Sequence, residues 1–284
     1  MKKILILLAA CLVGLVACSH GNGNSAGGGS GKGGGGTPAS AYMGTKAPDM
    51  AKEVGDIVFN DGSATPYTQD LELTKEQKTA AIAVIFYKGT DLNSGESTAS
   101  RTLGVGLKQN KTGVYWCTNL ADAYELNITT IQCPASGSAR ALQFVSGDRN
   151  GSDNLEQIGE FAGVTDTTGA GAKDLYPAFY FAKNYTVGDG EYTTGWYLPS
   201  IAEIFQIFAC MKDTESGADI DAAIELCAGD KFETERYYWT ATQFANDSKI
   251  AYGFTFGSGD WVPDEKSGDG GVGQKGYACA IREF

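Results

Sequence analysis

The pattern of apolar and polar positions divides the chain into three parts. Residues 4–16 are apolar without interruption, and residues 19–38 contain ten glycines in twenty positions. A glycine-rich polar stretch has too little apolar surface to support a packed core, so we expect a solvated, flexible tether there. Beyond it, apolar runs of strand and helix length recur, which predicts one folded body over residues 53–284.

The strongest strand signals lie in the first part of the body. Residues 80–87 (AAIAVIFY) form a continuous apolar run of strand length, and residues 101–108 alternate and are expected to pair with it. Residues 54–59 precede the turn signal NDG at residues 60–62. Further short strands, rich in aromatic and β-branched side chains, are expected at residues 237–240, 250–256 and 277–282.

Several helices are expected between these strands. Thr74 and Gln77 have capping-box spacing, which predicts a helical turn after Thr74. The clearest helix covers residues 201–211, with Pro199 presetting its first turn and Ser200 capping it. Further helices are expected at residues 116–125 and 220–227. This mixture of elements predicts an α+β fold, in which helices pack on an irregular antiparallel sheet.

Composition and charge narrow the possible functions. The 284 residues are 42% hydrophobic and 11% aromatic, enough for a substantial core. A net charge of −12, from 22 Lys and Arg against 34 Asp and Glu, argues against nucleic acid as a partner. The single histidine, His20, lies in the tether. Catalytic triads, Cys-His dyads and histidine-ligated zinc are therefore excluded from the body.

The first residues have the features of an export signal. Lys2 and Lys3 precede the apolar run, whose thirteen residues are too few to cross a hydrocarbon core about 30 Å thick. The run ends in LVAC at residues 15–18, which resembles the bacterial lipobox closely. That resemblance implies cleavage before Cys18 and acylation of this cysteine.

Three segments follow from this interpretation. Residues 1–17 are expected to be the signal peptide, residues 18–52 the lipid anchor and tether, and residues 53–284 the folded domain. Ser19, where inner-membrane lipoproteins have Asp, resembles the outer-membrane sorting pattern. We therefore expect an exported protein that is anchored to a bacterial membrane, at the outer membrane or the cell surface.

Four short motifs, in their order and spacing, resemble a known family. They are GDIVF at residues 55–59, GWYLPS at 195–200 followed by Glu203, YWTAT at 238–242 and CAIREF at 279–284. Together they are similar to the Lcl C-terminal domain family, named after a collagen-like bacterial adhesin and often found on secreted proteins and lipoproteins. The resemblance implies a C-type-lectin-like fold of largely unknown function. It identifies a fold but no site.

Five cysteines remain after the leader and the lipobox, and export to an oxidising compartment favours disulfides among them. Two disulfides and one free thiol are the simplest arrangement. Cys117 with Cys133 would close a short loop, which stabilises by about 3 kcal/mol in the chain-entropy model. Cys227 with Cys279 is the second pairing we predict, which leaves Cys210 as a buried thiol.

The candidate ligand site is the glycine-rich acidic stretch at residues 257–273. There Trp261 lies among several carboxylates, including Asp260 and Asp264. An exposed Trp could stack on a sugar ring, and the carboxylates could hold Ca²⁺, although no cofactor is expected. The alternative is an acidic surface loop with Trp261 folded inward. A second candidate surface, residues 176–185 (YPAFYFAKNY), is better interpreted as packed core.

The body is therefore interpreted as a non-catalytic binding module of a lipoprotein, for adhesion or glycan capture. Its partners would be the lipid bilayer, through acylated Cys18, and a glycan or protein ligand. The alternative is a structural or protein-interaction role in the cell envelope. A carboxylate-dependent hydrolase is a third interpretation, but pairs such as Glu233 with Glu235 are more typical of a solvated surface.

Overall fold

The computed structural model describes residues 42–93, 97–128, 149–152, 155, 158–159, 172–187, 190–212, 219–244, 246–268 and 274–284. These residues belong to one compact unit, Ser40–Phe284. The predicted signal peptide, Cys18 and the glycine-rich tether lie outside the described residues. Within the described ranges, no helix has both the length and the apolar character needed to cross a membrane.

The first sheet has six strands. Their order is β2 (Ala64–Pro66), β1 (Asp56–Phe59), β3 (Ala81–Gly89), β4 (Arg101–Gly106), β11 (Ile281–Glu283) and β6 (Trp196–Tyr197). All neighbours in it are antiparallel, and the predicted pairing of β3 with β4 is confirmed, with Val84 opposite Val105. β3 reads as a continuous apolar run because both of its faces are buried.

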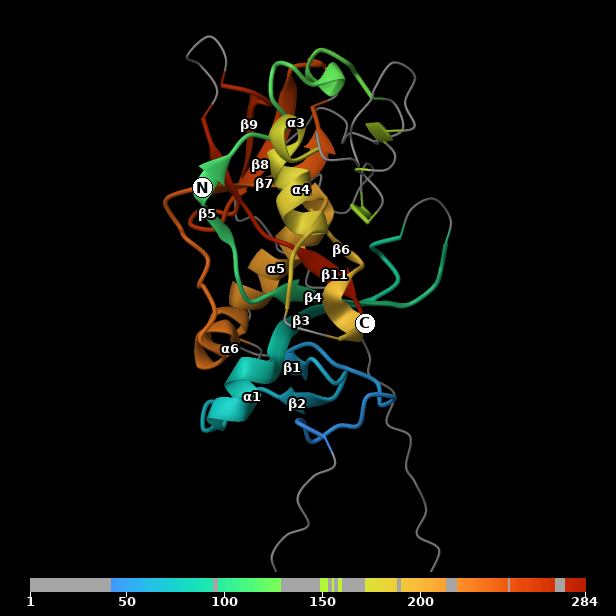
Figure 1. The fold of residues 1–284 in the computed structure, drawn as a ribbon, viewed down its shortest axis with the longest axis vertical. Coiled ribbons are helices and arrows are strands. Elements are labelled where there is room, and N and C mark those ends of the chain that lie inside the picture. The colour runs from blue at the N-terminus through green and yellow to red at the C-terminus, as the bar shows by residue number, and fades with distance from the viewer. Residues whose placement is uncertain are drawn as a thin grey trace, which may run out of the picture. The chain divides into compact units, whose positions relative to one another are not determined.

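The second sheet has five strands, so the expected single sheet is a pair of sheets. Their order is β5 (Asn110–Val114), β10 (Gly276–Ala278), β7 (Tyr237–Gln243), β8 (Ile250–Thr255) and β9 (Asp260–Glu265). β10 is parallel to β7, and the other pairs are antiparallel. The strand predicted at residues 277–282 is split, because Cys279 and Ala280 carry the chain from one sheet to the other. β1 and β2 lie at one end of the body and β7, β8 and β9 at the other (Figure 1).

Helices cover the two faces of the sheets. α5 (Ile201–Lys212) contacts β3, β7 and β8, and α6 (Ile220–Leu226) contacts β3. α4 (Pro177–Lys183), which follows α3 (Ala172–Leu175), contacts β5, β6 and β10. Two hydrophobic cores result. One contains Ile204 and Phe254, and the other contains Phe179 and Trp239.

The helix α1 (Lys75–Ala80) begins where the sequence predicts. Thr74 Oγ1 accepts a hydrogen bond from Gln77 N at 3.2 Å, and Gln77 Oε1 accepts one from Thr74 N at 3.0 Å. Both halves of the predicted capping box are therefore present. The predicted helices at residues 201–211 and 220–227 are also confirmed, as α5 and α6.

The helix predicted at residues 116–125 is not formed. Only the single 3₁₀ turn η1 (Asp122–Tyr124) occurs there. Cys117 N donates to Lys266 O and Thr118 N to Leu175 O, so these amides bond to distant segments. Tertiary backbone pairing thus overrides the local helical pattern.

The folded body begins before the predicted boundary at residue 53. Lys46 pairs with Ala64 as an antiparallel bridge, and Lys46 Nζ lies 2.6 Å from Asp56 Oδ2. Met43 N donates to Asp61 Oδ2 at 2.8 Å. Residues 43–46 are therefore attached to β2 and the turn before it. The sequence pattern missed this attachment because the segment is polar and pairs through its backbone.

Candidate functional site

The first turn of α5 anchors a buried polar network. Ser200 Oγ accepts a hydrogen bond from Glu203 N at 3.3 Å, and Glu203 Oε2 accepts one from Ser200 N at 2.8 Å. This is a capping box of the Ser-x-x-Glu type, which fixes the start of the helix. Ser200 caps the helix as predicted. Pro199 precedes the cap and does not preset the first turn, because α5 begins at Ile201.

Glu203 is fully buried and accepts four hydrogen bonds. Besides the Ser200 amide, Oε2 accepts from Gly151 N at 3.0 Å. Oε1 accepts from Tyr197 Oη at 2.9 Å and from Arg101 Nη1 at 3.3 Å. A side chain at Gly151 would meet Leu198 O at 2.5 Å, so the close approach requires glycine.

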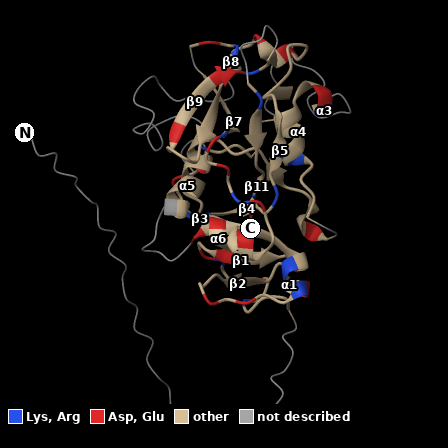
Figure 2. Cartoon of the chain, turned by 90° about the vertical axis from the view of Figure 1, so that its left-hand side faces the viewer, with Lys and Arg blue, Asp and Glu red and all other residues tan. Residues whose placement is uncertain are grey.

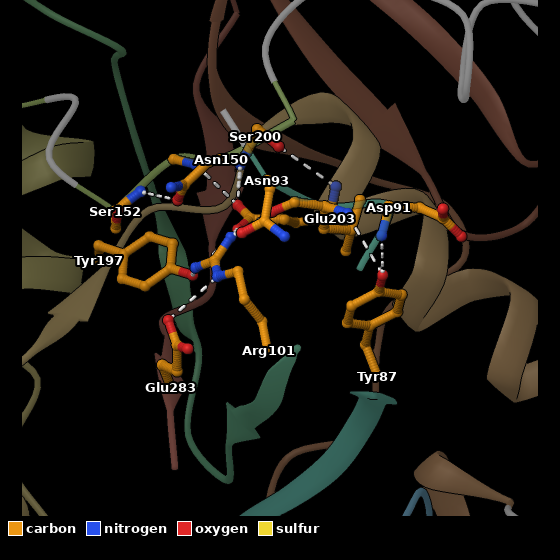
Figure 3. A network of polar contacts seen from close by, with 12 residues as sticks. Tyr87, Asp91, Asn93, Arg101, Asn150, Ser152, Tyr197, Ser200, Glu203 and Glu283 are labelled. Atoms are coloured by element: carbon orange, nitrogen blue, oxygen red, sulfur yellow. Dashed lines mark hydrogen bonds and ion pairs between the residues drawn. The ribbon is translucent and has the colours of Figure 1, made fainter. Parts of the chain in front are cut away.

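Arg101, the first residue of β4, is the centre of this network (Figure 3). Its guanidinium donates from Nε to Glu283 Oε2 at 3.0 Å, from Nη1 to Leu92 O at 2.5 Å and from Nη2 to Tyr197 Oη at 2.8 Å. Its side chain is 5% exposed. The network therefore joins β4, β11 and β6, which are neighbours in the six-stranded sheet, to the start of α5.

Burial governs the protonation of these groups. It raises the pKa of the Glu203 carboxyl, against the opposite effect of Arg101 and the backbone amides. It also raises the pKa of Tyr197, and the neighbouring Glu203 adds to this effect. Burial alone would lower the pKa of Arg101, but Tyr197, Glu203 and Glu283 together raise it. Arg101 is therefore a permanent cation and Tyr197 a permanent hydrogen-bond donor.

The network positions two residues in the wall of a cavity. A carboxyl with a raised pKa is often a general acid, but only where a substrate can reach it. Glu203 has no exposed surface, and each of its two carboxylate oxygens already accepts two hydrogen bonds. Tyr197 and Glu283, in contrast, also line a cavity. The buried pair thus holds two cavity residues in place.

The cavity has a volume of about 660 Å³, within the range of small-ligand sites. Its apolar lining comes from Leu155, Phe179, Trp196 and Leu198. Hydroxyl and amide groups are contributed by Ser152, Asn184, Thr186, Thr193, Thr194 and Tyr197. Lys183 and Glu283 supply one charge of each sign. This lining suits a polar, uncharged ligand that presents both hydroxyl groups and an apolar face.

The candidate Trp261 is not a surface residue. It belongs to β9, which the sequence pattern missed, and lies opposite Phe254 of β8 with 7% of its surface exposed. Its ring packs edge to face against Tyr252, with centroids 5.7 Å apart. Trp261 is therefore folded inward, as in the alternative, although on a strand and not in a loop, and it is not the exposed ring that stacking on a sugar requires.

The carboxylates beside Trp261 do not converge. Asp260 and Asp264 are four residues apart on one strand, about 13 Å at 3.3 Å per residue, so they cannot share one cation. Asp264 instead accepts a hydrogen bond from Tyr237 Oη at 3.0 Å. No three His, Cys, Asp or Glu side chains among the described residues gather as a metal site would require.

The predicted disulfide between Cys227 and Cys279 is not formed, since both are free thiols. Their surroundings differ. Cys227 is the C-cap of α6 and is close enough to Lys78 to feel its charge. Cys279 lies between β10 and β11 and is influenced by the charge of Glu203. Cys117 is likewise a buried free thiol, and Cys133 lies outside the described residues. Cys210 is only half buried, and its Sγ lies 2.9 Å from Phe86 O.

The second candidate segment, residues 176–185, has two roles. It forms α4 with its flanking tyrosines, and Tyr176, Phe179 and Tyr185 are buried, as the core interpretation predicts. At the same time Phe179, Lys183 and Asn184 line the cavity. Glu203 carries a detectable signal, the Ser-x-x-Glu spacing before an apolar run. Arg101 carries none, because the side chains that it bonds to are 96 to 182 residues away in the chain.

Comparison with solved structures shows a likeness of fold. The chain resembles a fimbrial protein from Bacteroides ovatus, with a TM-score of 0.53 and 15% sequence identity. The match covers 82% of this chain and 49% of the fimbrial protein, so the chain spans about half the length of that protein. The fold is thus a mixed α+β fold that resembles a fimbrial protein. No protein-family model matches the chain, and no curated protein matches its sequence.

Proposed function

We propose that the chain is an exported, lipid-anchored surface protein whose body is a non-catalytic adhesion module with a C-type-lectin-like domain. The observation that carries the proposal is the fold likeness to a fimbrial protein over 82% of the chain. Fimbriae are surface organelles, so the likeness agrees with the export signal and lipobox at residues 1–18. It also agrees with the similarity of four motifs to the Lcl C-terminal domain family.

The ligand-binding site of this module is the cavity beside the Arg101 network. Its lining mixes an aromatic and aliphatic surface with six hydroxyl and amide side chains and two opposite charges. A neutral sugar has matching chemistry, because its ring carries hydroxyl groups at the edge and C–H groups on the face. The function proposed for the cavity is therefore glycan capture.

Glycan binding is tested with a glycan array probed with the full chain in a neutral detergent. Thr194 is exposed at the cavity wall, so Thr194→Trp should fill the cavity without disturbing the core. Thr68→Trp, at an exposed loop position away from the cavity, is the matched control. We expect neutral-glycan hits that Thr194→Trp abolishes and Thr68→Trp keeps. Hits that both variants keep would refute the cavity as the site.

Anchoring is tested separately in cells of an export-competent bacterium. Cys18→Ser should remove palmitate labelling and release the body from the membrane fraction. Protease added to intact cells should cleave the wild-type body if the anchor places it at the surface. Labelling that persists in Cys18→Ser would refute the lipobox assignment. Protection from protease would instead favour a periplasmic structural role, the alternative function.

A further inference from the structure

A second concave site lies on the five-stranded sheet, outside the cavity described above. It has a volume of about 390 Å³, and its lining includes Lys111, Arg236 and Lys275. Lys111 belongs to β5, Arg236 directly precedes β7, and Lys275 directly precedes β10. β10 pairs with both of the other strands, which brings the three cations together. No carboxylate is among its described lining residues.

Two of these cations are not engaged by carboxylates. No ion pair involves Arg236 or Lys275 within the part of the chain that the structure describes, and Arg236 is exposed. Lys275 Nζ lies 5.4 Å from the ring centroid of Tyr115. The backbone at Gly113 leaves room for the Lys275 side chain. Gly113 has a φ of +80°, and a side chain there would meet Lys275 Cβ at 2.9 Å.

The third cation is held in a fixed position. Lys111 Nζ donates to Lys231 O at 2.8 Å and lies 3.0 Å from Glu233 Oε1. Glu233 is half exposed, so solvent screens this pair. Among the described residues, Asp264 also lies close to the site, because it accepts hydrogen bonds from Tyr237 Oη and from the amide of Gln274, a lining residue. Three cations thus stand against the carboxylates of Glu233 and Asp264. The site therefore keeps an excess of positive charge.

This excess contrasts with the rest of the molecule. Removing residues 1–17 takes away two lysines and changes the net charge from −12 to −14. Acidic side chains are spread over the body (Figure 2). A long polyanion would be repelled by that surface, whereas one anionic group could enter the basic site. Arg236 offers the paired N–H donors that match a carboxylate or sulfate, and the lysines add point charges.

We propose that the site formed by Lys111, Arg236 and Lys275 binds the carboxylate or sulfate group of an acidic sugar. The anion site follows from the three cations alone. The choice of a sugar as the carrier of the anion rests on the proposed function. A surface module with this site would bind acidic glycans in which the charge is local, such as a chain end bearing a uronic acid, in addition to the neutral sugars proposed for the cavity.

The experiment measures binding of the full chain in neutral detergent to three probes at low salt: trigalacturonic acid, the neutral galactose trisaccharide and sodium sulfate. We expect trigalacturonic acid to bind more tightly than the neutral trisaccharide and the sulfate. Arg236→Gln and Lys275→Gln should each weaken its binding by about tenfold, the value of one charge-assisted hydrogen bond. Lys173→Gln removes an exposed positive charge elsewhere and is the matched control, with wild-type binding expected.

Three outcomes would overturn the proposal. Equal affinity for the acidic and neutral trisaccharides would refute the anion site. So would an equal loss of trigalacturonic acid binding in Lys275→Gln and Lys173→Gln. Sulfate that binds as tightly as trigalacturonic acid would overturn the sugar assignment. Failure here is distinguishable from failure of glycan capture in the cavity, because that function is lost in Thr194→Trp and unaffected by Lys275→Gln.

Discussion

Arg101 and Glu203 form a buried ion pair that joins the start of β4 to the first turn of α5, with Nη1 and Oε1 3.3 Å apart. The two residues are 102 positions apart in the chain. Because Tyr197 and Glu283 bond to the same arginine and also line the cavity, the pair connects the fold to the candidate site. Disturbing it should affect stability first and ligand binding second.

Removing one partner of this pair should be costly. Glu203→Ala leaves the Arg101 cation without its buried counter-ion, and we expect a loss of about 3–5 kcal/mol in the free energy of unfolding. Urea denaturation followed by tryptophan fluorescence measures it. Glu225→Ala is the control, since Glu225 pairs with Lys231 on the open surface and should change little. Similar stabilities for the two variants would contradict the buried pair.

Trp261 should behave as a core residue and not as a ligand contact. Trp261→Ala should lower the free energy of unfolding by about 3–5 kcal/mol, because its packing against Tyr252 is lost. Trp261→Phe should cost less, since the indole Nε1 has no hydrogen-bond partner among the described residues. A folded Trp261→Ala protein with wild-type stability but no glycan binding would restore the surface interpretation.

The free thiols can be counted directly. For this test the chain is expressed in a bacterium with export to the periplasm, purified without reductant, unfolded in guanidinium and alkylated with iodoacetamide. Mass spectrometry should then find Cys117, Cys227 and Cys279 carrying the label, because the structure has them as thiols. A peptide pair joined through Cys227 and Cys279 that appears only without reductant would show the disulfide instead.

Alkaline pH should destabilise the fold. Burial raises the pKa of the Cys117, Cys227 and Cys279 thiols to about 12, whereas an unfolded cysteine titrates near about 8.5. Between these values the unfolded chain has lost the thiol protons and the folded chain retains them. Stability should therefore be unaffected by these groups below about pH 8.5 and fall from there to about pH 12.

The test of this pH dependence compares two variants with the wild type. Cys279→Ala removes one titrating group and should flatten the decline in unfolding free energy between pH 9 and 11. Val105→Ala, a core substitution without a titrating group, should lower stability equally at every pH. An unchanged slope in Cys279→Ala would show that buried thiols do not carry the effect.

Local signals predicted much of the fold. The capping box at Thr74, the apolar run of β3 and the start of α5 each depend on neighbouring residues, and each is confirmed. Pairing between strands that are far apart in the chain was harder to predict from the sequence. β9 contains Pro263 and has an acidic residue at each end, a pattern that is typical of a loop. It forms a strand because it pairs with β8. Pro263 is tolerated there because β9 is an edge strand.

The candidate site was harder to predict for the same reason. The cavity is lined by segments between residues 151 and 283. Of these, only residues 176–185 were a candidate ligand surface in the sequence, and the motif at residues 195–200 indicated a fold and no site. Arg101 looks like an ordinary strand residue, because its four partners come from four other parts of the chain. The basic site on the second sheet is similarly dispersed, with cations at positions 111, 236 and 275.

The positions of β10 and β11 also constrain the order of folding. β11 lies between β4 and β6 in one sheet, and β10 lies between β5 and β7 in the other. Neither sheet can close until residues 276–283 have been synthesised. Such late, long-range pairing makes folding slow. Delayed closure of both sheets would suit the export proposed above, because a chain that is still unfolded can pass through a translocation channel.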